Sequence, residues 1–399
     1  MQRTIFRFAF LAVPLVTASA AATSSAGCSS DDGGTATPVA DAAPEAAADA
    51  FVPPIMEDAA PPMDADAGPP KRDCTADLQA DGVQQHLDCT GLYADFAAKT
   101  VAPENAPYTP GVQFWSDGAE KSRFLYLPPG SKIDITNFDE WSFPKGTKVW
   151  KEFKIGGKRI ETRFFAKGMD GMWRHTTYRW NDAETDAVRK DNGEKVTIPG
   201  QTAVYEVPNT GQCDYCHAGR ADQLLGVEAV NLGLSTAQGM TLAALASGGH
   251  LSATPPVTSI TIPEDTTTKA AAALGWLHAN CGGCHNANPN AAATFTGVHF
   301  LLNASQLAGD GGTPTVAATD TWTTAVGFDS SRQNVDAGVP YKIIAPGDPT
   351  QSLASILSGR RATGAEEPNA QIQMPPIVTR QVDTTGHALL DAWIGALPP

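Results

Sequence analysis

The stretch TTTKAAAALGWLHANCGGCH, residues 266–285, joins a helical pattern to a cysteine motif and decides the fold of the C-terminal part of the chain. Its apolar side chains recur at helical spacing, at Ala270, Ala273, Leu274 and Leu277. This periodicity predicts a helix over residues 266–280 that ends in Cys281-Gly282-Gly283-Cys284-His285. The spacing C-x-x-C-H lets two thiols on a tight turn bond one haem while the adjacent histidine coordinates its iron.

A second copy of the motif, Cys213-Asp214-Tyr215-Cys216-His217, lies upstream. Two copies in one chain predict two covalently attached haem c groups, with His217 and His285 as axial ligands. The alternative is a zinc site, because repeated C-x-x-C pairs also supply four thiolates. Zinc binding would leave the histidine after each pair without a role, so haem attachment is the favoured interpretation.

The second haem has a clear candidate for its sixth ligand. A methionine thioether is the usual choice in electron transfer, because it raises the reduction potential. Met374 lies in QIQMPP, residues 371–376, shortly before a predicted final helix over 383–396. We therefore assign His285 and Met374 to the second haem; the alternative is a core methionine in a proline-rich loop.

The sixth ligand of the first haem is open. Met240, in a predicted helix over residues 236–247, is the favoured candidate. His250 and His278 are alternatives. A further alternative is an open or water-bound iron, which would imply chemistry on a substrate rather than electron relay.

Residues 263–399 are expected to form a mainly α-helical domain of the class I cytochrome c type. A helix is predicted over 349–358, with Asp348 as its cap. The final helix should pack on the first through Ala388, Leu389, Ala392, Trp393 and Leu397. The Gly-, Thr- and Asp-rich stretch 309–339 is expected to be a surface insertion.

Upstream, the pattern changes to short strands, so the chain is predicted to be an α+β protein whose N-terminal β-rich domain, residues 74–210, is sandwich-like. Strands are expected at residues 124–127, 148–155, 159–166, 174–180 and 202–207. Residues 211–262 form the first haem-attachment segment. Five of the eight tryptophans fall in the β domain and are expected in its core rather than in a ligand site: Trp115, Trp141, Trp150, Trp173 and Trp180.

The N-terminus has the layout of a secretory signal over residues 1–28, with Arg3 and Arg7 before an apolar run. Residues 25–28, SAGC, resemble a bacterial lipobox and make Cys28 the expected lipid anchor; cleavage after residues 18–20, ASA, is the alternative. Residues 29–73 are rich in Pro, Ala and acidic residues, which predicts a disordered linker. The protein is therefore expected outside the cytoplasm, in the periplasm or cell envelope.

Charge and cysteine usage agree with export. The net charge is −15, which opposes binding to nucleic acid. Of seven cysteines, four belong to the two motifs and Cys28 to the anchor. Cys74 and Cys89 remain, and in an oxidising compartment they are expected to pair as a disulfide.

The motifs FWSDGAEK (114–121), YLPPG (126–130), FPKGT (143–147) and IETR (160–163), followed by two C-x-x-C-H motifs, resemble a family of exported bacterial di-haem c-type cytochromes. The likeness covers roughly residues 95–399. It implies a β domain ahead of a cytochrome c domain but no particular reaction.

These features predict an electron-transfer protein whose partners are a redox donor and a redox acceptor protein. The alternative is an enzyme, either a di-haem peroxidase or another haem oxidoreductase whose β domain binds substrate. A non-redox binding lipoprotein is a third and weaker class.

Overall fold

The structure is a computed structural model that describes residues 71–309, 313–331, 335–336, 339–363 and 366–399. The predicted signal, the anchor Cys28 and nearly all of the linker therefore lie outside the described residues. Residues 68–399 form one compact unit, and the domain boundaries expected after residues 210 and 262 fall inside it. No helix among the described residues combines the length and apolar character needed to cross a bilayer.

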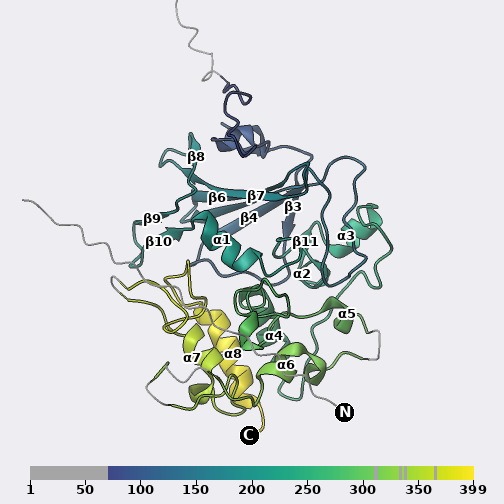
Figure 1. The fold of residues 1–399 in the computed structure, drawn as a ribbon, viewed down its shortest axis with the longest axis vertical. Helices are drawn as coiled ribbons and strands as arrows, with labels where there is room; N and C mark the ends of the chain where they lie inside the picture. The colour runs from purple at the N-terminus through teal and green to yellow at the C-terminus, as the bar shows by residue number, and fades with distance from the viewer. Residues whose placement is uncertain (1–70, 310–312, 332–334, 337–338, 364–365) are drawn as a thin grey trace, which may run out of the picture. The chain divides into compact units, whose positions relative to one another are not determined.

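An antiparallel sheet of seven strands, in the order β11-β3-β4-β5-β6-β7-β8, organises the β part (Figure 1). The strands are β3 Ala106–Thr109, β4 Glu120–Tyr126, β5 Lys148–Ile155, β6 Lys158–Lys167, β7 Trp173–Trp180, β8 Ala187–Arg189 and β11 Gln238–Gly239. The mixed α+β class is thus as predicted. The sandwich is not: beside this sheet the described residues show two-stranded ribbons, β1 Tyr93–Asp95 with β2 Thr100–Val101 and β9 Glu194–Val196 with β10 Tyr205–Val207.

The N-terminal segment covers one face of the sheet. Trp150, Phe164 and Tyr178 project from successive strands and pack with Leu87 and Leu92, all at most 1% exposed. This arrangement confirms that most of the tryptophans are core residues, since Trp141 and Trp180 are also buried. The segment includes one short 3₁₀ helix, η1 Leu87–Cys89.

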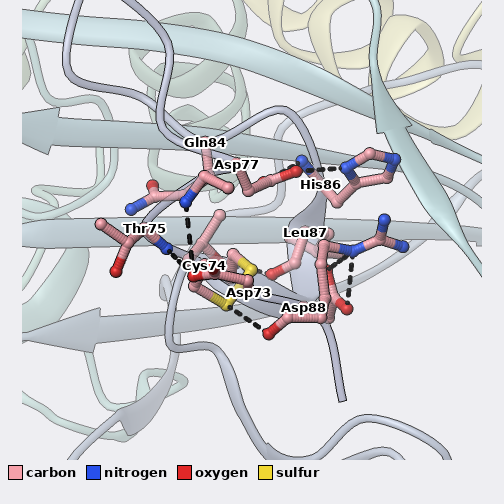
Figure 2. Close-up of a disulfide and its surroundings, with 12 residues drawn as sticks. Asp73, Cys74, Thr75, Asp77, Gln84, His86, Leu87 and Asp88 are labelled. Atoms are coloured by element: carbon pink, nitrogen blue, oxygen red, sulfur yellow. Dashed lines mark hydrogen bonds and ion pairs between the residues drawn. A yellow bond between two sulfur atoms is a disulfide. The ribbon is translucent and has the colours of Figure 1, made fainter. Parts of the chain in front are cut away.

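The disulfide Cys74–Cys89 closes this segment, as predicted (Figure 2). Its two Cα atoms lie 5.2 Å apart. Arg72 bonds both carboxylate oxygens of Asp88 at 3.1 Å, so the chain is held down where the described residues begin. A structural disulfide of this kind persists in an oxidising compartment, consistent with export.

Helices and loops pack on the opposite face, where Leu125, Val149 and Phe165 join the largest core cluster. These helices are α1 Thr210–His217, α2 Ala229–Gly233, α3 Leu242–Ser247, α4 Ala270–Asn280, α5 Ala304–Leu307, α6 Asp320–Ala325, α7 Leu353–Ser358 and α8 Thr384–Ala396, with 3₁₀ turns η2 Thr294–Thr296, η3 Val316–Ala318 and η4 Pro349–Gln351. Buried Val316, Thr321 and Ala325 contradict the prediction that 309–339 is purely a surface insertion.

The first and last predicted helices, α4 and α8, pack on each other as expected. Trp276 Nε1 of α4 donates to Asp383 at the start of α8 at 2.8 Å. The predicted α8 stripe is partly wrong: Leu389 is 39% exposed, whereas Leu390 and Ile394 are fully buried. Relative to the predicted orientation, α8 is rotated about its axis, so that Leu390, Trp393 and Ile394 are the apolar side chains buried where α8 packs on α4.

Helix starts differ from prediction where side chains cap the backbone. Helix α4 begins at Ala270 instead of 266, because Thr268 has a left-handed φ of 58° and Glu264 Oε1 accepts the Ala270 amide. The predicted helix 349–358 is divided into η4 and α7 at Ser352, whose backbone is extended and whose Oγ accepts the Ala345 amide. Asp348 caps η4 as predicted.

Candidate functional site

The second motif forms the turn that ends α4. The Cys281 amide still donates to Leu277, and the His285 amide donates to the Cys281 carbonyl at 2.9 Å. A Cβ on Gly282 would lie 2.5 Å from the His278 carbonyl oxygen, so this position of the turn requires glycine. The folded turn holds Cys281, Cys284 and His285 on the wall of one cavity.

The lining of that cavity suits a haem. Its empty volume, about 1160 Å³, includes open solvent at its mouth. The lining is mainly apolar and includes Leu277, Val298, Phe300, Leu353 and Leu357. A dry apolar shell with a few convergent ligands is what a covalently held haem requires.

Met374 lines the same cavity as His285, although the two lie far apart in the sequence. The Met374 amide donates to the Leu357 carbonyl at 2.9 Å, and Arg361 donates to the Met374 carbonyl at 3.2 Å. The structure therefore brings together the four residues assigned to the second haem from sequence: Cys281, Cys284, His285 and Met374.

Asp117, in the FWSDG stretch, fixes the segment after Met374. Its carboxylate accepts the backbone amides of Arg380 and Gln381, and it is 1% exposed. Trp115 Nε1 donates to the Gln381 carbonyl at 2.8 Å, and the Trp115 amide donates to Asn280 at the end of α4. The sequence motif gave no hint of this role, because its partners lie more than 160 residues away.

The first motif lies on α1, directly after β10. Asn209 and Gln212 form a capping box that starts the helix just before Cys213. Cys213 is 7% exposed, and burial raises its pKa to about 11. The motif thus follows a strand, as predicted, and is itself helical.

His217 is held as an iron-ligating histidine would be. Its Nδ1 lies 2.5 Å from the Gln223 carbonyl oxygen, and its ring stacks on Phe165 with centroids 4.4 Å apart. Burial lowers the pKa of His217 to about 3, so the ring is neutral and Nδ1 carries the proton donated to Gln223. The lone pair on Nε2 is then available for a metal.

The two motifs lie side by side. Cys284 Sγ is 3.6 Å from the Tyr215 carbonyl oxygen. A hydrogen bond between the Cys216 and Cys284 thiols lowers the pKa of Cys216 and raises that of Cys284. Gly219 approaches the carbonyl oxygen of Gly283 so closely that a Cβ would lie 1.8 Å from it.

The other predicted ligands lie elsewhere. Met240 is not helical as predicted: it follows β11, its amide donates to Pro107, and Thr241 caps α3 only after it. His250 precedes the bridge between Ile133 and Leu251. Among the described residues, no hydrogen bond or ring contact joins Met240 or His250 to the first motif.

His278 is a structural residue. Its Nδ1 accepts the Leu302 amide at 3.0 Å, and its Nε2 lies 3.3 Å from Glu228 Oε1. The side chain is almost fully buried, so both ring nitrogens are occupied inside the fold. The sequence did not indicate this Glu228–His278 pair.

All four motif cysteines lie in the described part of the chain. Within that part, no group of three or more His, Cys, Asp or Glu side chains is placed to hold a metal ion.

Comparisons with protein-family models, curated proteins and solved structures find no match to this chain.

Proposed function

We propose that the protein is an exported di-haem c-type cytochrome that relays electrons, with a class I cytochrome c-like part over residues 263–399. The observation that carries the proposal is the apolar cavity with Cys281, Cys284 and His285 on its wall together with Met374. A haem bound there would supply a one-electron Fe(III)/Fe(II) couple. The residues of the chain hold it, exclude water and set its potential.

In this proposal the two sites differ in coordination. His285 and Met374 ligate the second iron, which gives it a raised potential. His217 ligates the first iron, with its Nδ1 bonded to Gln223 to keep the ring oriented. Met240 remains the sequence-based candidate for the other side of that iron, without a contact that supports it.

The contact between the motifs supports relay between the haems. Cys216 and Cys284 are neighbours, so the thioethers formed there would attach the two porphyrins at adjacent points of the chain. An electron entering at one haem would have a short path to the other. Donor and acceptor proteins outside the chain would complete the relay, and lipidation at Cys28 would keep the protein at a membrane.

The test is a haem count combined with an intact mass, on protein matured in a host that attaches haem c. The reduced-pyridine spectrum should give two haems per chain. The double variants Cys213→Ala/Cys216→Ala and Cys281→Ala/Cys284→Ala should each retain one haem. Cys74→Ala/Cys89→Ala is the matched control and should retain both. A colourless wild-type protein, or one with stoichiometric zinc, contradicts the proposal.

The enzyme alternative is favoured by one observation: no described contact brings Met240 or His250 to the first motif. An iron ligated by His217 alone would be open to peroxide or another small ligand. Rapid cyanide binding at one haem, accompanied by peroxide turnover, would support the enzyme. Inertness of both haems would support relay.

A further inference from the structure

Three cations stand in register across the centre of the seven-stranded sheet. Arg123 of β4 is paired with Lys151 of β5, and Lys151 is paired with Arg163 of β6. Side chains directly opposite each other on neighbouring strands share one face and lie about 5 Å apart at Cβ. Thr177 of β7 extends the same row. We call Arg123, Lys151, Arg163 and Thr177 the cationic row.

The row lies next to the first motif. The neighbouring row on the same face contains Phe165 and His175, paired across β6 and β7. Phe165 stacks on His217, and His175 Nε2 lies 3.2 Å from the Thr210 carbonyl oxygen of α1.

Two members of the row, Arg123 and Thr177, have buried polar atoms without partners. Arg123 is 3% exposed, and both of its terminal nitrogens have no hydrogen-bond acceptor. Thr177 is 2% exposed with its hydroxyl also unpaired. A buried guanidinium without a counter-charge costs several kcal/mol, so such a group calls for an anion.

The described polypeptide does not supply that anion. Glu161 lies two residues before Arg163 on β6. Its carboxylate accepts hydrogen bonds from Arg163 at 3.1 and 2.6 Å and from the Tyr205 hydroxyl at 2.7 Å. Lys151 Nζ lies over the rings of Phe114 and Phe153, at 5.4 and 5.0 Å from their centroids. Three positive side chains of the row therefore face one carboxylate that is already engaged.

We infer that the cationic row binds carboxylates, and that these are the propionates of the haem attached at Cys213 and Cys216. The inference rests on the proposed function. A guanidinium forms a bidentate pair with a carboxylate, and a hydroxyl at the end of the row adds a further donor. A covalently attached haem would bring two carboxylates to the sheet face on which His217 is stacked.

The test uses full-length protein carrying both haems, with isotope-labelled propionate carboxylates. Arg123→Met removes the unpaired cation. Thr177→Val removes one hydroxyl without changing the side-chain shape, and it serves as the second variant if Arg123→Met does not accumulate. Lys158→Met is the control, because Lys158 is an exposed cation on β6 and its loss changes net charge equally. The readouts are the labelled carboxylate bands in redox difference infrared spectra and the potential of each haem.

We expect both row variants to shift the labelled bands, and Arg123→Met to lower the potential of the first haem only, since a lost positive charge favours ferric iron. Lys158→Met should change neither. Unshifted bands in a protein that retains two haems overturn the row assignment alone. A second result would also overturn the row assignment. If added acetate shifts the potential of the wild-type protein to a saturating value while the labelled bands stay fixed, the row binds a free carboxylate instead. A wild-type chain without haem at Cys213 and Cys216 overturns the proposed function as well.

Discussion

The two C-x-x-C-H motifs occupy contrasting surroundings. The second lies at the end of α4 in a cavity with apolar walls, with Met374 among its lining residues. The first lies on α1 against a sheet face that carries Phe165, His175 and buried cations. Under the proposed function, haems attached in two such environments would differ in reduction potential, because burial, ligand and nearby charge set that potential. The contrast predicts that the sites can be altered one at a time.

The largest effect is expected from removing the aromatic ring at each histidine. Phe165 stacks on His217, and Phe300 contacts His285 edge-on at 5.3 Å; both rings are 5% exposed. Either change to Ala should cost about 3–5 kcal/mol of stability by denaturant unfolding, because it empties a core position. Under the proposed function, Phe165→Ala should perturb the spectrum of the first haem alone, and Phe300→Ala that of the second. Equal perturbation of both haems by either variant would remove the distinction.

Acid should next destabilise the region between the sites. Burial alone would raise the pKa of Glu228, but its hydrogen bonds with His278 and the Asn231 amide, and the charge of Arg220, lower it to about 2. Because the folded pKa lies below the unfolded value, this stabilisation is complete above about pH 4.5 and is lost as the pH falls towards 2. The loss should be on the order of a few kcal/mol, measured as the acid dependence of unfolding.

Glu228→Gln is the control for the acid prediction. Glu228 Oε2 accepts the Val230 amide at 2.6 Å and Oε1 accepts the Asn231 amide at 2.8 Å, and the carbonyl oxygen of Gln keeps one of these two acceptors. The variant should be less stable at neutral pH and should lose the part of the acid dependence that belongs to this pair. An unchanged acid profile would assign the dependence to other carboxylates.

A smaller effect is expected where the motifs touch. Gly219→Ala places a Cβ against the Gly283 carbonyl, which must shift, at a cost of about 1–3 kcal/mol. Gly211→Ala is matched to it because Gly211 lies in α1 and its nearest neighbour is 3.5 Å away. That control should be neutral or stabilising by no more than about 1 kcal/mol. If the two variants have the same unfolding temperature, the close approach of the motifs is wrong.

The smallest effect on stability should come from Met374→Leu, which keeps volume and should cost less than about 1.5 kcal/mol. Its effect on the second site should nevertheless be large, with a lower potential for one haem and access of cyanide to its iron. Spectroelectrochemical titration measures both. An unchanged spectrum and potential would remove Met374 as a ligand.

Local patterns in the sequence were sufficient for much of the fold. The strands β5, β6 and β7, the helices α4 and α8 and both cysteine motifs could be predicted because periodicity and spacing are properties of neighbouring residues. The predicted start of α4 is wrong because a side chain outside the apolar pattern decides the backbone: Glu264, six residues earlier, accepts the Ala270 amide. Met240 is not helical because its amide donates to the Pro107 carbonyl, a partner that is remote in sequence.

The relations between sites could not be predicted at all. The cationic row exists only because the register of three strands aligns Arg123, Lys151 and Arg163. Similarly, the neighbouring thiols Cys216 and Cys284 come from α1 and from the turn after α4, which are far apart in sequence. A single sequence specifies such register and packing through many non-local contacts, each too weak to recognise by itself.

The burial of Cys213 constrains the biogenesis of the protein. In the folded chain Cys213 is nearly inaccessible, so an enzyme that ligates porphyrin to thiols could not reach this cysteine. Under the proposed function, the chain must be met by its maturation machinery while still open. Export, ligation and closure would then follow in that order, and a chain that closed early would be a dead end for assembly.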